Sequence, residues 1–444
     1  MTEPSAARLL ALKTLLTVEK KKAFASLALQ KAKLSERELR LATELVYGTL
    51  REQSLLDWWL ERGTEKVLSK LASPVRVNLR LALYQCAFAD AIPERAAVEQ
   101  AVALARKFTP QAAKFVNWAL RATLRQAEPF ALPKEDDPLT YLAIRYSHPK
   151  WLVQLWLEQL GEERTLRLLA ANQTHARLAV RVNTLRTGVQ ELQAALSDEG
   201  IQSRPGLLPE ALEVTHGRPA KTAAFAAGMF MIQSEASQLA SHLLAPRPGE
   251  RVLDLAAAPG GKTTHLAQLM ENRGEIVACD LYRQRLNLIE ENCRRLGVKI
   301  VRTLCADGRQ IKGRSEGTFS KILLDAPCSG LGVLRGKPDL RWHKSPEEIA
   351  GLPLLQKELL SAAASVTAPG GEICYSTCTI NKAENQEVVT EFLAAHPGFQ
   401  LLPFGERLPA VVRERFSDAD GMLQLLPSEH KLDGFFFALL KRLG

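Results

Sequence analysis

The stretch of sequence that decides the fold is VLDLAAAPGGKTT, residues 252–264. It begins with an apolar segment around Asp254, continues through a loop of small residues, and leads from Gly260 and Gly261 into Lys262. Glycines let the backbone approach a ligand closely, and the N–H groups at the start of a helix are free to bind it. The stretch therefore predicts a strand, a ligand-binding loop and a helix in direct succession.

The chain after residue 233 repeats this alternation of strand and helix. Segments typical of buried strands occupy residues 251–255, 275–280, 299–305, 321–325 and 372–376, with helical patterns such as 282–296 and 347–366 between them. Two last strands, near 422–426 and 435–440, are expected to form a closing hairpin. This spacing predicts an α/β fold with a mostly parallel, doubly wound sheet.

The sequence before this region has two further parts. Residues 5–125 show helical periodicity, and Ser35 followed by Glu38 is typical of a helix start. A segment rich in proline and charge, 128–138, reads as a linker. A small α+β unit follows, with helices in 150–171 and at 189–196, and strands at 178–182 and near Ile201 and Leu212. We therefore expect three domains, 1–128, 139–230 and 231–444.

The net charge of +9 is unevenly distributed over the 444 residues. Residues 1–125 hold 21 basic and 12 acidic side chains, whereas the remaining residues hold 37 of each. A basic segment of this kind favours a nucleic-acid partner, although a basic helical domain without that role would have the same composition. No apolar run reaches 18 residues, so we expect no membrane span.

The seven cysteines have irregular spacing and include no Cys-x-x-Cys pair. This pattern favours a reducing cytoplasm and argues against a disulfide framework or a zinc site, so no bound metal is expected. Cys328 and Cys378 each follow a predicted strand, at the sheet edge where open α/β folds bind ligands. The other five are expected to be buried small hydrophobic residues: Cys86, Cys279, Cys293, Cys305 and Cys374.

Acidic residues follow successive predicted strands. Asp280 ends the second strand, where a carboxylate can accept hydrogen bonds from both hydroxyls of a ribose. Asp307, after the third strand, can meet an adenine amino group, and Asp325 ends the fourth. A nucleoside ligand explains this series. A triphosphate would be repelled by these carboxylates in the absence of magnesium, whereas the sulfonium cation of S-adenosylmethionine suits an acidic pocket.

A phosphate-binding P-loop is the main alternative for residues 256–263. Gly261, Lys262 and Thr263 fit the pattern Gly-x-x-x-x-Gly-Lys-Ser/Thr, but Ala256 occupies the position of the first glycine. The alternative function would be a nucleotide hydrolase that uses its basic domain to hold RNA. A third hypothesis is an RNA-binding module on an inactive methyltransferase fold, and the presence of both cysteines argues against it.

Two thiols beside a methyl donor suit methylation of a pyrimidine at C5. This carbon is a poor nucleophile until a thiolate adds to C6, after which C5 can attack the methyl group. Removal of the C5 proton and loss of the thiolate restore the ring. The target base must be unpaired or flipped out, because stacking hides C6. The strand-end positions by themselves allow either Cys328 or Cys378 to be the nucleophile.

At these residues the chain resembles the RNA 5-methylcytosine methyltransferases, in particular the bacterial small-subunit ribosomal RNA enzymes of the Sun/Fmu type. The resemblance covers most of the chain. It rests on RYSHPKW at 145–151, VRVN at 180–183, IQSEAS at 232–237, the loop 256–262, DAPCSG at 325–330, KPD at 337–339, YSTCT at 375–379, and Glu384-Asn385-x-Glu387.

The resemblance implies a Rossmann-like methyltransferase domain, a NusB-like RNA-binding domain at the N-terminus, and methylation of a cytosine in small-subunit ribosomal RNA. Separately, we expect the protein to be a monomer. The resemblance further implies that Cys378 is the nucleophile and that Cys328 helps product release. The residues implied to bind S-adenosylmethionine are Ala256, Ala257, Ala258, Pro259, Gly260, Gly261, Lys262, Asp280, Asp307 and Asp325. Whether Asp325 also contacts the target base stays open.

Two departures from the family pattern are modest. Ala256 stands where the family often has Cys, and Ser234 where many members have Asp. A polar or electrostatic role is expected for Lys262, in preference to that of a solvated lysine at a helix start. Three basic residues shortly after Cys328 are expected to contact RNA phosphates, with a solvated loop as the alternative: Arg335, Lys337 and Arg341.

Overall fold

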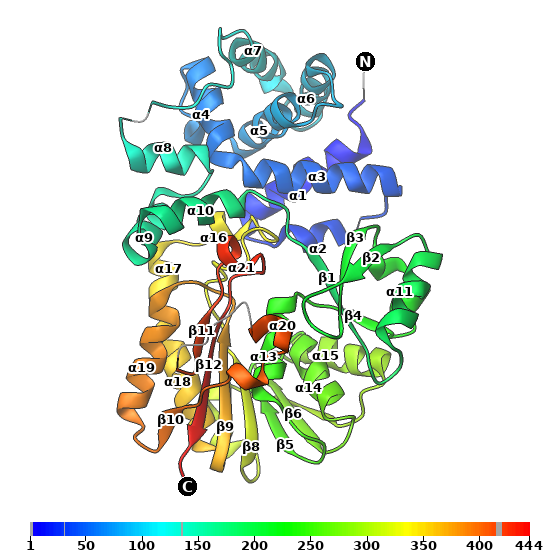
Figure 1. Ribbon diagram of the computed structural model, residues 1–444. Coiled ribbons are helices and arrows are strands. Elements are labelled where there is room, and N and C mark those ends of the chain that lie inside the picture. The colour runs from blue at the N-terminus through cyan, green and yellow to red at the C-terminus, as the bar shows by residue number, and fades with distance from the viewer. Residues whose placement is uncertain (1–2, 31, 135, 414–419) are drawn as a thin grey trace. The chain divides into compact units, whose positions relative to one another are not determined.

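The structure is a computed structural model, and it describes residues 3–30, 32–134, 136–413 and 420–444. The chain forms two compact units (Figure 1). The first contains the residues up to Thr174 together with Lys337–Ser345, and the second contains His175–Gly336 and Pro346–Gly444. The chain therefore leaves the second unit for one short segment before it returns.

The first unit consists of helices, as the apolar periodicity predicts. Ser35 caps α3, because its Oγ accepts a hydrogen bond from the backbone N–H of Glu38 at 3.4 Å. The α-helices are α1 (Ala6–Lys21), α2 (Ala25–Gln30), α3 (Glu36–Arg51), α4 (Gln53–Thr64), α5 (Ser73–Phe88), α6 (Glu94–Phe108), α7 (Ala113–Leu124), α8 (Pro138–Arg145), α9 (Lys150–Leu160), α10 (Glu162–Asn172) and α16 (Leu340–His343).

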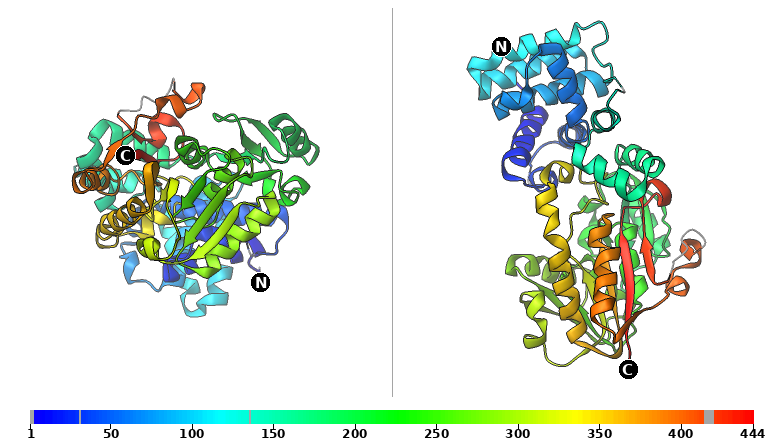
Figure 2. Two further views of the ribbon diagram at one scale, coloured as in Figure 1. Left: turned by 90° about the horizontal axis from the view of Figure 1, so that it is seen from below. Right: turned by 90° about the vertical axis from the view of Figure 1, so that its left-hand side faces the viewer.

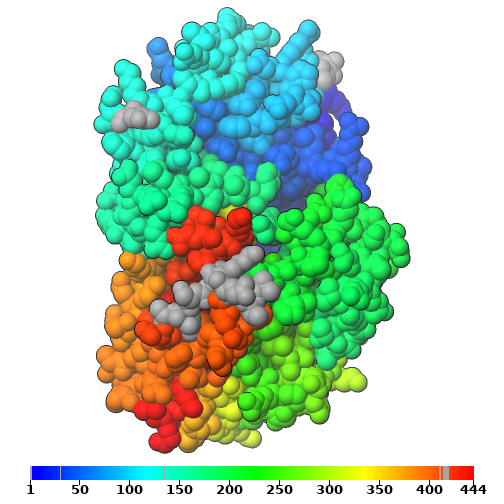
Figure 3. All heavy atoms as spheres, viewed as in Figure 1, coloured from blue at the N-terminus to red at the C-terminus, as the bar shows by residue number. Residues whose placement is uncertain are grey.

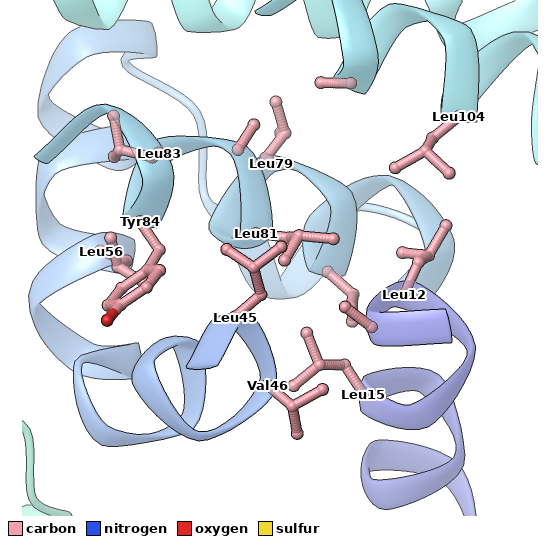
Figure 4. Close-up of a cluster of buried hydrophobic side chains, with 14 of the residues drawn as sticks. Leu12, Leu15, Leu45, Val46, Leu56, Leu79, Leu81, Leu83, Tyr84 and Leu104 are labelled. Carbon is pink, nitrogen blue, oxygen red and sulfur yellow. The ribbon is translucent and has the colours of Figure 1, made fainter. Parts of the chain in front are cut away.

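Leucine side chains from α1, α3, α4, α5 and α6 meet in the core of this unit (Figure 4). Each fully buried leucine contributes about 1.5–3 kcal/mol relative to its exposed state. Tyr84 of α5 lies against Gly48 of α3, where a Cβ atom would stand 2.0 Å from the tyrosine ring. The Tyr84 hydroxyl donates a hydrogen bond to Glu44 at 2.6 Å. The glycine thus lets α3 and α5 approach each other closely.

The contacts place α8, α9 and α10 in the first unit, although we expected them to open the middle domain. Between Leu124 and Pro138 the described residues contain no helix or strand, in agreement with the expected linker. The domain limits 1–128, 139–230 and 231–444 remain a proposal, because contacts and sequence divide the chain differently at this point.

The segment Lys337–Ser345 anchors itself inside the first unit through Arg341 of α16. This side chain is fully buried, and its guanidinium donates to the carbonyl oxygens of Ser147 at 2.9 Å and Asn172 at 3.2 Å. The prediction that Arg341 contacts RNA phosphates is wrong, because its guanidinium is buried and both terminal nitrogens donate to groups inside the protein. Arg335 of the second unit is also buried and pairs with Asp433, so the prediction fails there too. Lys337 is exposed.

The second unit opens with a small antiparallel sheet in the strand order β2-β3-β1-β4. Its strands are β1 (Leu178–Val182), β2 (Gln202–Pro205), β3 (Ala211–His216) and β4 (Phe230–Ile232), and helix α11 (Val189–Asp198) packs on it. Three of the strands and the helix agree with the sequence prediction. β4 was missed because three residues carry too little alternation to be recognised.

The larger sheet has the strand order β10-β12-β9-β8-β5-β6-β7, with β11 paired to β12. The central neighbours β9, β8, β5, β6 and β7 are parallel, and β10, β11 and β12 pair antiparallel. The strands are β5 (Arg251–Asp254), β6 (Glu275–Asp280), β7 (Val301–Cys305), β8 (Phe319–Asp325), β9 (Thr367–Thr377), β10 (Phe399–Leu401), β11 (Met422–Gln424) and β12 (Phe436–Arg442). The doubly wound sheet and the closing hairpin β11–β12 are confirmed.

Helices cover both faces of this sheet (Figures 1 and 2). Val252 of β5 faces a core formed with α13 (Glu235–Leu244), α14 (Gly261–Leu269) and α15 (Arg283–Leu296). Leu253 faces the opposite core, formed with α18 (Leu352–Ser365) and α19 (Gln386–Ala395). Because both faces are buried, the central strands are continuous apolar runs, and this made them recognisable in the sequence.

Differences from the sequence prediction are small in the second unit. The helix expected at 347–366 is broken at Gly351 into α17 (Pro346–Ala350) and α18, and β10 was not predicted. Residues near the C-terminus, orange and red in Figure 3, form part of the surface of this unit. Within the described ranges, the structure contains no helix of the length and apolar character that a bilayer crossing requires.

Candidate active site

Asp254, the last residue of β5, supports the loop between β5 and α14. Gly260, with a φ of 93°, precedes α14, and a Cβ there would lie 3.1 Å from the backbone of Ile289. The hydroxyl of Thr263 donates a hydrogen bond to the buried carboxylate of Asp254 at 2.7 Å. Burial raises the pKa of Asp254 to about 7. The glycine and this hydrogen bond together fix the start of the helix.

Asp280, at the end of β6, contacts the same loop. Its carboxylate accepts hydrogen bonds from the backbone N–H of Ala258 at 3.3 Å and of Tyr282 at 3.2 Å. Asp307 follows the neighbouring strand β7, and the guanidinium and backbone N–H of Arg309 keep the pKa of this carboxyl below its usual value. The predicted loop and acid series therefore lie along one edge of the sheet.

Lys262 joins this loop to the end of β8. Its ammonium group lies 2.6 Å from Asp325 and 5.3 Å from the ring centroid of Phe435, and the side chain is largely buried. Burial lowers the pKa of Lys262, but the Asp325 carboxylate more than compensates, and the net shift is upward. Lys262 is thus a charged residue inside the site, and the alternative of a solvated lysine is wrong.

The two cysteines are brought together at the ends of β8 and β9. The Sγ atoms of Cys328 and Cys378 are 3.4 Å apart. The pKa of Cys328 is raised well above its ordinary value by the contact with Cys378, by burial, and by the carboxylates of Glu384 and Asp325. Cys328 therefore keeps its proton and can donate its S–H to the sulfur of Cys378.

Several polar residues around the cysteines were not assigned roles from the sequence. Ser376 donates to the second oxygen of Asp325 at 2.8 Å, and Glu384 accepts from the backbone of Ser329 at 2.8 Å. Both residues belong to motifs that carry part of the family resemblance, Ser376 to YSTCT and Glu384 to Glu384-Asn385-x-Glu387, so the sequence did point to them. Sequence spacing cannot reveal which loop each side chain reaches.

Arg181 of β1 connects the small sheet to the loop between β5 and α14. Its guanidinium is fully buried and donates to the carbonyl oxygen of Gly261 at 2.7 Å and to the hydroxyl of Thr264 at 3.0 Å, both at the start of α14. It also donates to the side chains of Gln233 and Gln268. The VRVN motif at 180–183, which includes Arg181, therefore supports the loop between β5 and α14 directly.

Glu210, which directly precedes β3, forms a cluster with His242 of α13 and His265 of α14. The Glu210 carboxylate is 2.6 Å from Nε2 of His242 and 3.0 Å from Nε2 of His265. Burial lowers the pKa of His265 to about 3, so this ring is neutral. The negative charge of Glu210 is thus opposed by the nearby Arg181 guanidinium.

Three of the other cysteines are buried as predicted, namely Cys279, Cys293 and Cys374, and Cys86 is half-buried. The prediction is wrong for Cys305, which is exposed. This residue ends β7, the last strand in the sheet order, so the sheet provides no further strand beside it. An edge strand has the apolar pattern of a buried strand but fewer neighbours to cover it.

A doubly wound sheet with a glycine-containing loop after its first strand and an acid after the next is typical of Rossmann-like folds that bind a nucleoside cofactor, the class to which the S-adenosylmethionine-dependent methyltransferases belong. Comparison with known proteins narrows this class. Residues 241–441 match the family described as 16S rRNA methyltransferase RsmB/F, residues 5–125 match the NusB family, and residues 148–221 match the ferredoxin-like domain of RsmF/B-like methyltransferases.

The chain is 37% identical to the probable ribosomal RNA small subunit methyltransferase B of Bacillus subtilis, with 98% of each protein covered. It matches the crystal structure of PH0851 with a TM-score of 0.84 and 30% identity over all of both chains. It also matches NSun6 from Pyrococcus horikoshii with SFG, with a TM-score of 0.60 and 26% identity over 67% of this chain and 98% of that one. This chain belongs to the RsmB/F family of rRNA methyltransferases. That membership overturns the P-loop alternative.

Proposed function

We propose that this protein transfers a methyl group from S-adenosylmethionine to C5 of a specific cytosine in small-subunit ribosomal RNA. The observation that carries the proposal is the pair of thiols, 3.4 Å apart, beside the Lys262–Asp325 ion pair. The family membership supports the substrate class, since the curated relatives are named as small-subunit rRNA methyltransferases.

Cys378 is the nucleophile in this proposal. A thiolate is the reactive form of cysteine, and a nearby positive charge favours it. The Lys262 ammonium interacts electrostatically with Cys378, and Cys328 can donate its S–H to the same sulfur. The pKa of Cys328 is raised, first by its contact with Cys378 and then by burial and by the carboxylates of Glu384 and Asp325. These charges favour attack by Cys378 and a protonated Cys328.

The reaction follows from these positions. Sγ of Cys378 bonds to C6 of the cytosine, and the electrons of the C5–C6 double bond become available at C5. S-adenosylmethionine supplies the methyl group to C5, and its sulfonium–methyl bond breaks to leave the neutral thioether S-adenosylhomocysteine. A base then removes the C5 proton, the bond between C6 and Cys378 breaks, and the thiolate is returned. We assign to Cys328 the role of helping this last step, in which product is released.

The residues at the strand ends fit the methyl donor. Asp280 suits the ribose hydroxyls and Asp307 the adenine, while Gly260 offers a loop position whose φ disfavours any side chain. The full set proposed to bind the donor is Ala256, Ala257, Ala258, Pro259, Gly260, Gly261, Lys262, Asp280, Asp307 and Asp325. No metal ion is required by this chemistry.

The first unit is proposed to hold the RNA. A groove of roughly 500 Å³ between α6 and α7 is lined by Arg106, Lys114 and Arg121, with Glu99 as its one acidic residue. A neighbouring groove is lined by Arg95, Arg121 and Arg125 together with Glu94 and Glu99. Basic side chains in a groove suit a phosphate backbone. Trp118, also on α7, is 46% exposed, and an exposed aromatic ring can stack on an unpaired base. We further propose that the protein acts in the cytoplasm as a monomer.

Bisulfite sequencing of small-subunit rRNA tests this function. RNA from cells that contain the protein should keep one cytosine unconverted, and that cytosine should be converted when the gene is deleted. Restoring the gene should restore the protection, whereas a gene encoding Cys378→Ser should not. Identical conversion at every cytosine with and without the protein would overturn the proposal.

A further inference from the structure

We propose that Glu384 is a positioning residue that holds the Cys328 loop and the Cys378 loop at a fixed separation. The inference deepens the proposed function and rests on it for its catalytic meaning. Glu384 is fully buried at the turn that precedes α19, in the Glu384-Asn385 motif that has no role in the chemistry described above. Its carboxylate contacts the residues that directly follow the two cysteines.

Ser329 and Thr379 are those two residues. One oxygen of the Glu384 carboxylate accepts a hydrogen bond from the Ser329 backbone N–H at 2.8 Å. The other accepts from the Ser329 hydroxyl at 2.5 Å and lies 3.5 Å from the Thr379 hydroxyl. The two hydroxyls are themselves 2.7 Å apart. One carboxylate thus connects the chain after Cys328 with the chain after Cys378.

Two amide side chains complete the environment of this carboxylate. Nε2 of Gln356 donates to Glu384 at 3.1 Å and to the carbonyl oxygen of Pro327 at 2.9 Å, so it holds the residue before Cys328 as well. Nδ2 of Asn381 donates to Glu384 at 3.1 Å. A buried charge is tolerated only when donors surround it, and hydrogen bonds to an ionised acceptor are the stronger ones.

Asn385 fixes the strand end that carries Cys378 from the other side. Its amide donates to the carbonyl oxygen of Thr379 at 3.1 Å, and its side-chain oxygen accepts from the hydroxyl of Thr377 at 2.6 Å. The Tyr375 hydroxyl donates to the backbone carbonyl of Glu384 at 2.6 Å. The turn at 384–385 therefore grips β9 just before Cys378 and the chain just after it.

A carboxylate is needed at this position because three groups around it can only donate: the Ser329 backbone N–H and the side-chain NH2 groups of Gln356 and Asn381. Glu384→Gln would turn its own NH2 group either toward the Ser329 N–H and Gln356 or toward Asn381. In either orientation a donor faces a donor, and the cysteine loops lose at least one hydrogen bond to residue 384. Displacement of a reacting group by about 1 Å can cost on the order of 100-fold in rate.

The test compares Glu384→Gln with Glu387→Gln in the full-length protein. Glu387 is exposed on α19, so the control makes the same chemical change three residues further along. Methyl transfer to rRNA gives kcat and KM, and calorimetry gives the affinity for S-adenosylmethionine. Phenylarsine oxide, whose arsenic bonds to two neighbouring thiolates, reports the separation of Cys328 and Cys378 independently of catalysis. Cys378→Ser supplies the background binding of the arsenical.

We expect Glu384→Gln to lower kcat by on the order of 100-fold. The KM for RNA and the affinity for S-adenosylmethionine should stay near those of the control. Binding of the arsenical should weaken by about tenfold, a change of about 1.4 kcal/mol. The proposal is overturned if kcat and arsenical binding match the Glu387→Gln control, or if the loss appears only in S-adenosylmethionine or RNA binding. If the wild-type protein methylates no cytosine but Glu384→Gln still binds the arsenical more weakly than Glu387→Gln does, the positioning role of Glu384 stands and only the proposed function is overturned.

Discussion

The Lys262 ammonium lies 2.6 Å from the Asp325 carboxylate, and this ion pair connects the loop between β5 and α14 with the loops that carry Cys328 and Cys378. Lys262 lies in the first turn of α14, and Asp325 ends β8 three residues before Cys328. The second oxygen of Asp325 accepts a hydrogen bond from Ser376, two residues before Cys378. One carboxylate therefore links the proposed donor site to both thiols, and the account depends on this link.

Replacing the lysine should separate the two halves of the site. Lys262→Met keeps most of the side-chain volume but removes the charge that opposes Asp325 and favours the Cys378 thiolate. We expect kcat to fall by on the order of 10²–10³, as for the loss of one electrostatic stabiliser. The control is Lys357→Met, which removes the ion pair between Lys357 of α18 and Glu391 of α19, and it should retain activity. A Lys262→Met enzyme as fast as this control would contradict the proposed role.

Asp254 should make stability depend on pH in a defined direction. Its pKa rises from 3.8 to about 7 in the folded protein, mainly through burial. A carboxyl whose folded pKa is raised favours folding while it is protonated, and this contribution is lost as the pH rises toward 7. The ionised form therefore costs roughly 4 kcal/mol above pH 7, at about 1.4 kcal/mol for each pKa unit.

Asp254→Asn removes this titration and keeps an oxygen for Thr263. Its free energy of unfolding, relative to that of the wild type, should increase between pH 4 and pH 7 and level off above pH 7. Urea unfolding at several pH values, without S-adenosylmethionine, measures this difference. A difference that does not change with pH would show that Asp254 titrates normally in the folded state.

The groove between α6 and α7 predicts how RNA binding responds to salt. Lys114→Gln and Arg121→Gln together remove two cationic groups that line it. We expect weaker binding to every RNA tested, and a dependence of log Kd on log salt that is shallower by about 1 for each residue. Arg167→Gln, an exposed residue paired with Glu163 on α10, is the control. An unchanged salt dependence in the double variant would place the RNA elsewhere on the protein.

The sequence predicted the larger sheet well because its central strands are buried on both faces. Val252 and Leu253 enter opposite cores, so the strand is apolar without interruption and stands out between polar loops. The three-residue strands β4 and β10 have no such signal. Gly351, which breaks the helix expected at 347–366, lies in a pattern whose periodicity continues on both sides.

The sequence predicted that the main site residues lie at one edge of the sheet, but it did not predict the contacts between them. Strand ends placed Asp280, Asp325, Cys328 and Cys378 at one edge, because parallel strands share that edge. The partners of these residues are distant in sequence, as with Lys262 and Asp325, and no spacing rule connects them. For Arg341 the sequence suggested a wrong partner. A basic residue in an expected loop suggested a phosphate contact, but its guanidinium is buried and donates to backbone carbonyl oxygens.

The division of labour between the two cysteines is the central claim, and it is tested most directly by trapping the covalent complex on a denaturing gel. The full-length protein with Cys328→Ser or Cys378→Ser is incubated with rRNA and S-adenosylmethionine. The account predicts that Cys328→Ser accumulates a protein–RNA adduct that survives denaturation, and that Cys378→Ser forms no adduct and transfers no methyl group. An adduct with Cys378→Ser, or full methyl transfer by that variant, would contradict the assignment of Cys378 as the nucleophile.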